Sequence, residues 1–131
     1  MPPRKVNPRA AYRLKQRDQI EASPLMAERF PRLKGLRVTL EFFDATGNTK
    51  QGEMKCKLNV AQASSAVWFG CRSGECVGGD FDLSGAVAKA VAERRRVVTG
   101  ELRCQGARKR GDDAVVPCQT LLRYKLNLNY E

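Results

Sequence analysis

Four cysteines in the second half of the chain decide its fold. They occur as Cys71-Arg-Ser-Gly-Glu-Cys76, as Cys104-Gln-Gly106 and as Pro117-Cys118. Thiolates favour zinc or iron over magnesium or calcium, and four of them complete a tetrahedral site. The chain has no histidine, so cysteine is the soft ligand that it offers. We therefore predict that Cys71, Cys76, Cys104 and Cys118 hold one structural Zn²⁺ without an open position for chemistry.

The residues around these cysteines also indicate a metal site. Gly78 and Gly106 each follow a cysteine by two positions. A chain that turns back over a metal-bound sulfur needs positive φ and a close backbone approach at such positions, which glycine allows. Cys71 and Cys104 each follow an apolar, strand-like run, so we expect both of them at the ends of strands.

Two other interpretations of the four cysteines stay open. Cysteine often packs in a core as a small hydrophobe, and cysteine pairs form disulfides in oxidising compartments. No apolar signal-peptide core follows the first five residues, so we expect a reducing, cytoplasmic location that disfavours disulfides. The fifth cysteine, Cys56, alternates with Met54 and Leu58 and is predicted to be an ordinary buried strand residue.

The remaining pattern predicts an α+β fold, an antiparallel sheet of about five strands with one internal helix. Residues 36–42, 54–60 and 121–130 alternate apolar and polar side chains, as half-buried strands do. The runs before Cys71 and at 97–102 supply two more strands. Residues 80–84 are expected to open the helix, which runs to about residue 95 with Asp82 or Ser84 as its cap. The length of 131 residues suits one domain, here residues 36–131.

Residues 1–35 are predicted to form a basic, helical N-terminal arm. The chain holds 24 Lys and Arg against 14 Asp and Glu, a formal charge of +10. Ten of the basic residues and three of the acidic ones lie in residues 1–37. Asn7-Pro8 predicts a helix over about 8–22, and Ser23-Pro24 predicts a short one that ends by Phe30. Such an arm resembles those that lie along nucleic acids; the alternative is a solvated tail.

Two further basic groups follow the arm. Loop 105–117 is predicted to protrude as a charged finger. Arg94, Arg95 and Arg96 end the internal helix, either because its dipole favours cations there or because they contact phosphate. The residues that we predict to contact nucleic-acid phosphates lie in the arm and the finger: Arg4, Lys5, Arg9, Arg13, Lys15, Arg17, Arg108, Lys109 and Arg110.

We expect no enzyme activity, no small-molecule substrate and no membrane association. The sequence lacks histidine for acid–base catalysis, a Gly-x-x-x-x-Gly-Lys phosphate loop, a Gly-x-Ser-x-Gly elbow and a convincing two-metal acidic cluster. No apolar run approaches the roughly 18 residues of a membrane span.

Cysteines that are followed two positions later by glycine, within a β-rich chain, resemble those of the zinc-ribbon class. Together with Phe81-Asp82-Leu83 and Leu122-Arg-Tyr-Lys-Leu126, they resemble small bacterial four-Cys proteins over roughly residues 36–130. Zinc ribbons serve in transcription, translation and nucleic-acid processing. The resemblance and the charge imply a non-enzymatic zinc protein that contacts RNA or a ribonucleoprotein such as the ribosome. The alternative is a zinc-stabilised adaptor whose N-terminal helix docks in a protein partner through Leu14 and Ile20.

Overall fold

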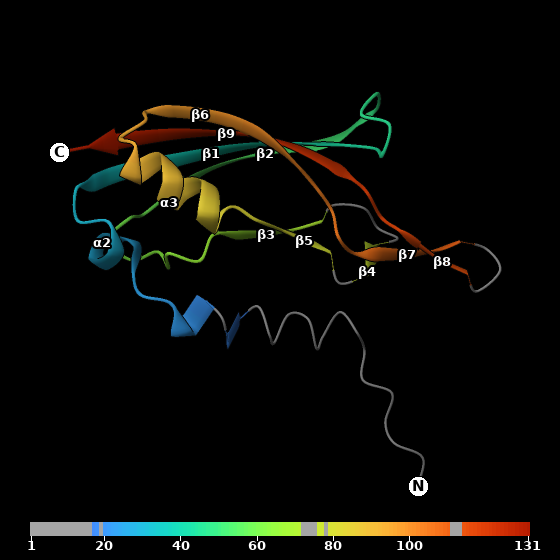
Figure 1. Cartoon of the computed structure of the whole chain (residues 1–131), viewed down its shortest axis with the longest axis horizontal. Coiled ribbons are helices and arrows are strands. Elements are labelled where there is room, and N and C mark those ends of the chain that lie inside the picture. Colours follow the sequence, from blue (N-terminus) through green and yellow to red (C-terminus); the bar gives the residue numbers. More distant parts are fainter. Residues whose placement is uncertain (1–16, 19, 72–75, 78, 111–113) are drawn as a thin grey trace, which may run out of the picture.

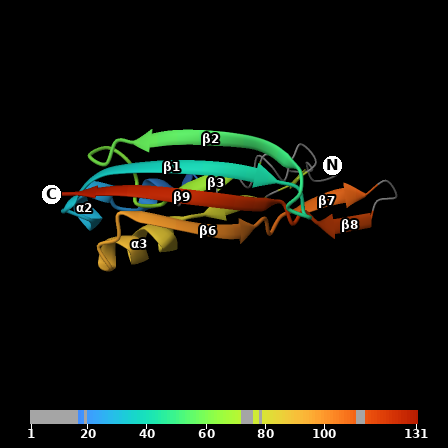
Figure 2. The same ribbon diagram turned by 90° about the horizontal axis from the view of Figure 1, so that it is seen from above.

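A four-stranded antiparallel sheet forms the centre of the computed structural model, which describes residues 17–18, 20–71, 76–77, 79–110 and 114–131. Its strands lie side by side in the order β2-β1-β9-β6 (Figure 1; Figure 2). The four strands are β1 (Leu33–Phe43), β2 (Lys50–Leu58), β6 (Val97–Arg103) and β9 (Leu121–Tyr130).

Apolar rows cross the two central strands of this sheet. Val38 lies opposite Leu126, and Phe42 lies opposite Leu122. Because side chains of a strand alternate between its two faces, these rows all point to one face. The predicted alternation in 36–42 and 121–130 is confirmed by the burial of every second residue along β1 and of most such residues along β9.

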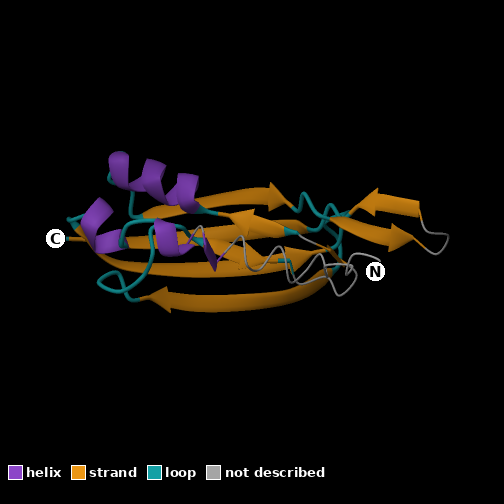
Figure 3. Ribbon diagram, turned by 90° about the horizontal axis from the view of Figure 1, so that it is seen from below, coloured by secondary structure: helices purple, strands orange, loops and turns teal. Residues whose placement is uncertain are grey.

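Two helices and a small ribbon cover the apolar face of the sheet (Figure 3). The helices are α2 (Met26–Arg29) and α3 (Ser84–Ala92), and the ribbon pairs β3 (Trp68–Gly70) with β5 (Asp80–Asp82). Phe81 of the ribbon packs against Phe42 of the sheet with the rings tilted by 59° and their centroids 5.9 Å apart. Val87 of α3 is fully buried, so the helix contributes to the same core.

A third, three-stranded sheet extends beyond one end of the main sheet (Figure 1; Figure 2). It comprises β4 (Cys76–Val77), β7 (Ala107–Arg110) and β8 (Ala114–Pro117), with β7 in the middle. The predicted finger is thus a β-hairpin made of β7 and β8.

The sheet differs from the five-stranded one that the sequence predicts. The apolar run before Cys71 does not join the main sheet, because only three of its residues form β3 and they pair with β5. Residues 80–82 form that partner strand rather than the start of the helix, and Phe81 is buried there. The helix begins at Ser84, whose backbone N–H donates to the Asp82 carboxylate at 2.9 Å.

The described part of the arm is attached to the domain. Arg17, Asp18 and residues 20–22 are helical. The short helix α2 begins at Met26, later than Ser23-Pro24 predicts, because the backbone N–H of Met26 donates to the Ala63 carbonyl at 2.7 Å. Met26 and Phe30 are buried with Leu33 in the hydrophobic core. The core therefore includes residues on the arm side of the expected boundary at residue 36.

Candidate metal centre

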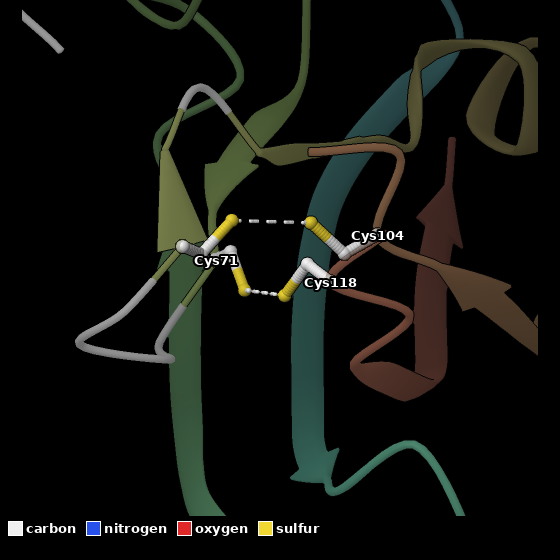
Figure 4. Close-up of side chains that lie close together, drawn as sticks. Cys71, Cys104 and Cys118 are labelled. Carbon is white, nitrogen blue, oxygen red and sulfur yellow. Dashed lines mark hydrogen bonds between the residues drawn. The ribbon is translucent and has the colours of Figure 1, made fainter. Parts of the chain in front are cut away.

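The four predicted cysteines lie together where the three sheets meet. Cys71 follows β3, Cys76 begins β4, Cys104 follows β6 and Cys118 follows β8. Their Sγ atoms all lie within 4.8 Å of one another (Figure 4). Residues 47 positions apart in the sequence thus converge on one point.

The spacing of the sulfurs fits a tetrahedral metal ion. Cys71 Sγ lies 3.8 Å from Cys118 Sγ, and Cys76 Sγ lies 3.6 Å from Cys104 Sγ (Figure 4). Zn–S bonds of about 2.3 Å place the sulfurs of a tetrahedral site about 3.8 Å apart. None of these cysteines forms a disulfide. A soft donor set of this size and shape could hold a metal ion.

Burial makes two of the thiols poor at ionising without a cation. Cys104 is completely buried, and Cys76 is 6% exposed. Burial is the main reason that the pKa of Cys76 rises to about 12, and burial raises the pKa of Cys104 as well. Thiolates at these positions therefore need a bound positive charge, which a metal ion supplies.

Cys118 differs from its neighbours because a polar side chain reaches it. The Thr120 hydroxyl, itself buried, lies 3.1 Å from Cys118 Sγ. Burial alone would raise the pKa of Cys118, but hydrogen bonds from Thr120, Cys76 and Cys71 outweigh it, and the pKa falls to about 7. The sequence analysis missed Thr120; a hydroxyl residue two positions after a cysteine was the available signal.

Two glycines let the backbone pack directly on the sulfurs. A side chain at Gly79 would collide with the Sγ atoms of Cys104 and Cys76, and one at Gly106 would lie 2.6 Å from Gly79 Cα. The Gly106 N–H also donates to Cys104 Sγ at 3.3 Å. The predicted close approach at Gly106 is confirmed, but its φ is not positive. Gly78 lies outside the described residues, and the sequence analysis missed Gly79.

Backbone hydrogen bonds fix the strand ends that carry Cys104 and Cys118. The Cys104 N–H donates to the Thr120 carbonyl at 2.9 Å, and the Cys118 N–H donates to the Gly106 carbonyl at 2.9 Å. Gln119 has a left-handed backbone with φ of 58°. The Arg103 guanidinium donates to the Gln119 carbonyl at 3.1 Å and so holds this turn. The thiols of this pair are thus positioned by the fold around them.

The remaining cysteine lies apart from this cluster. Cys56 lies on β2 opposite Val38 and is half-buried. Its predicted strand position is confirmed.

The predicted phosphate-contacting residues are placed only in part. Arg17 is exposed, and its Nε donates to Glu21 at 3.0 Å. The backbone of Arg108, Lys109 and Arg110 forms β7. The others lie outside the described residues: Arg4, Lys5, Arg9, Arg13 and Lys15.

Comparison with known proteins does not assign the chain to a family or to a known fold. No family model, no curated protein and no solved structure matches the chain. The resemblance to the zinc-ribbon class therefore stays a prediction. Among the described helices, none is long and apolar enough to cross a membrane.

Proposed function

We propose that the protein is a non-enzymatic zinc protein in which Cys71, Cys76, Cys104 and Cys118 bind one structural Zn²⁺. The observation that carries this proposal is the convergence of four sulfurs within 4.8 Å in a largely buried site. Four cysteine ligands leave no coordination position for water or substrate, so the ion holds structure.

The location of the site explains what the zinc stabilises. The ribbon β3–β5 and the sheet β4-β7-β8 consist of strands with two to four residues each. Strands this short bury little apolar surface and are marginal without further support. One ion bound by cysteines at the ends of β3, β4, β6 and β8 would join both small sheets to the main one.

The biological role that we propose is association with RNA or a ribonucleoprotein such as the ribosome. A formal charge of +10 and the basic strand β7, with the sequence Ala107-Arg-Lys-Arg110, support it. In this proposal the arm and the hairpin contact phosphates, which position a protein without reading sequence. The adaptor alternative stays a prediction, because Leu14 lies outside the described residues.

One measurement tests both parts of the proposal. Elemental mass spectrometry of freshly purified protein should find one zinc per chain, and its ultraviolet absorbance ratio should reveal co-purified RNA that nuclease and high salt remove. Iron in place of zinc would change the metal and keep the site. A metal-free, fully folded protein would contradict the zinc function.

A further inference from the structure

The open face of the main sheet carries charges that the proposed metal site does not use. This face lies opposite α3, and among the described residues no helix or strand covers it (Figure 2). Along each strand, the residues that alternate with the buried ones point to this open face. They are mostly charged or amide residues: Arg37 and Glu41 on β1, Lys55 and Lys57 on β2, and Arg123, Lys125, Asn127 and Asn129 on β9.

The two halves of this face differ in how their charges are balanced. In the half nearer the metal centre, Arg123 pairs with Glu101 at 3.1 Å, and Lys50 pairs with Glu53 at 2.7 Å. In the other half, Arg37 lies between Lys57 on one neighbouring strand and Asn127 on the other. Neither Arg37 nor Lys57 makes an ion pair within the described part of the chain.

Like charges directly opposite each other destabilise a sheet. Arg37 and Lys57 occupy such a pair, and Lys55 lies one row further along, across Thr39 from Lys125. All four cations are exposed. An anion bound across these rows would offset the repulsion, so this half of the face is complementary to a polyanion.

A shallow depression lies at the same end of the face. Its volume is about 580 Å³, and Gly35 contributes no side chain to fill it. The polar side chains around it are four cations and two amides, without a carboxylate: Lys34, Arg37, Lys57, Arg96, Asn127 and Asn129. Lys34 alone of the four cations has an ion-pair partner there, Glu131 at 3.5 Å.

The arginines after α3 extend this surface. The Tyr130 hydroxyl lies 2.7 Å from the Arg95 carbonyl and 3.2 Å from the Ala90 carbonyl. A tyrosine hydroxyl therefore provides the hydrogen-bond donor for the carbonyls at the C-terminal end of α3. Arg95 pairs with Glu93 at 4.0 Å. Arg94 and Arg96 instead line a neighbouring depression of about 490 Å³ together with Arg29 and Arg32. Arg96 borders both depressions and makes the basic surface continuous.

We propose that this basic surface, defined by Arg37, Lys57, Lys125 and Arg96 with the two depressions, binds the phosphate backbone of double-stranded RNA. The inference rests on the proposed association with RNA and places the contact on the folded domain. Backbone contact fits because phosphate binding needs cations. The first depression has no carboxylate in its lining, and the second has four arginines and one carboxylate, Glu131.

The surface suits duplex RNA better than a single strand or a membrane. Single strands stack their bases on exposed aromatic side chains, and Phe43, the aromatic residue on this face of β1, is half-buried beneath Arg123. Membrane binding needs an apolar face, yet the exposed large apolar residues of the described chain are Leu25 and Val97 alone. Asn127 and Asn129 add amides that can donate to and accept from the 2′-hydroxyl of RNA.

The test compares two full-length variants of equal charge. The surface variant carries Arg37→Gln, Lys57→Gln and Arg96→Gln. The control variant carries Lys50→Gln, Lys89→Gln and Arg123→Gln, which removes the same charge from the ion-paired half and from α3. Fluorescence anisotropy measures binding of a 20-base-pair RNA duplex, the matching DNA duplex and anionic lipid vesicles over a range of salt. Circular dichroism and zinc content check that each variant is folded.

We expect the surface variant to lose RNA affinity about tenfold or more at 0.1 M salt. The slope of the logarithm of its binding constant against the logarithm of the salt concentration should become shallower by about three. The control variant should stay within about threefold of the unsubstituted chain. Equal losses in both variants, or none in the surface variant, would overturn the inference and leave RNA association to the arm and the hairpin. Binding of DNA or vesicles in preference to RNA would overturn it as well. If the unsubstituted chain binds no RNA at all, the proposed association with RNA fails with it.

Discussion

The main sheet and the metal-centre end of the molecule are stabilised in different ways. Long strands cross in the main sheet, where β1 pairs with β9 over ten residue pairs and apolar rows form the core. At the metal-centre end, β4 pairs with β7 over two residue pairs, and four thiols from separate strand ends converge. The first sheet is stabilised by the apolar surface that it buries. For the second we infer that stability depends on the proposed metal ion.

Removal of one thiol should have the largest effect and should separate the two regions. Cys104→Ser leaves three ligands and a buried hydroxyl, so we expect loss of zinc and destabilisation on the order of 5 kcal/mol. Amide hydrogen exchange should rise first in β4, β7 and β8. Cys56→Ser is the matched control, since Cys56 is half-buried outside the cluster, and it should keep its zinc with a small cost. A folded, zinc-loaded Cys104→Ser protein would contradict the ligand assignment.

A core substitution in the main sheet should give the opposite pattern. Leu40 is fully buried on β1, and Leu40→Ala creates a cavity that costs about 2 to 5 kcal/mol. Chemical denaturation measures the loss, and the zinc content of the folded protein should stay at one per chain. Weaker zinc binding by folded Leu40→Ala protein than by the unsubstituted chain would show that the two regions are less independent than we infer.

The glycine that packs on the sulfurs should matter more for metal affinity than for the sheet. A methyl group at position 79 collides with two Sγ atoms, so Gly79→Ala should push the thiols apart and weaken zinc binding by at least tenfold, as competition with a chelator measures. Gly85→Ala is the control, because a methyl group there meets no atom within 4 Å and lies in α3. That variant should gain about 0.5 to 1 kcal/mol from helix propensity. Equal zinc affinity in both variants would show that the site can expand.

The sequence predicted the runs that form the main sheet, although β2 spans Lys50–Leu58 rather than 54–60. It also predicted the four converging cysteines, and both features leave a direct pattern in the chain. The alternation of apolar and polar residues along 121–130 indicates which face of the strand is buried. Because the chain has no histidine, the cysteines are the expected metal ligands. The short elements were not predictable in the same way. Residues 80–82 pair with β3, and Phe81 among them packs on Phe42, a contact between residues 39 positions apart. The start of α2 depends similarly on a distant group, because the Met26 N–H donates to the Ala63 carbonyl. No residue next to Met26 in the sequence predicts this contact.

The smallest effect should come from the hydroxyl that distinguishes Cys118. Thr120→Val keeps the shape of the side chain and removes the hydrogen bond to Cys118 Sγ, so zinc affinity should fall by only about tenfold while the fold persists. The same change should raise the pKa of Cys118 above about 7, the value that this hydrogen bond helps to maintain. A ligand thiol releases its proton on zinc binding only where the metal-free thiol is protonated.

Proton release therefore provides a second measurement for the same variant. In the unsubstituted chain, zinc binding should release more protons at pH 6 than at pH 8, because Cys118 is largely protonated below a pKa of about 7 and ionised above it. In Thr120→Val the pKa of Cys118 is higher, so a larger fraction of this thiol stays protonated at pH 8 and the difference between the two pH values should shrink. Titration with zinc in weakly buffered solution with an indicator dye counts these protons. An unchanged pH dependence alongside weaker binding would mean that Thr120 acts through packing, and the metal centre would then depend on its fold for shape alone.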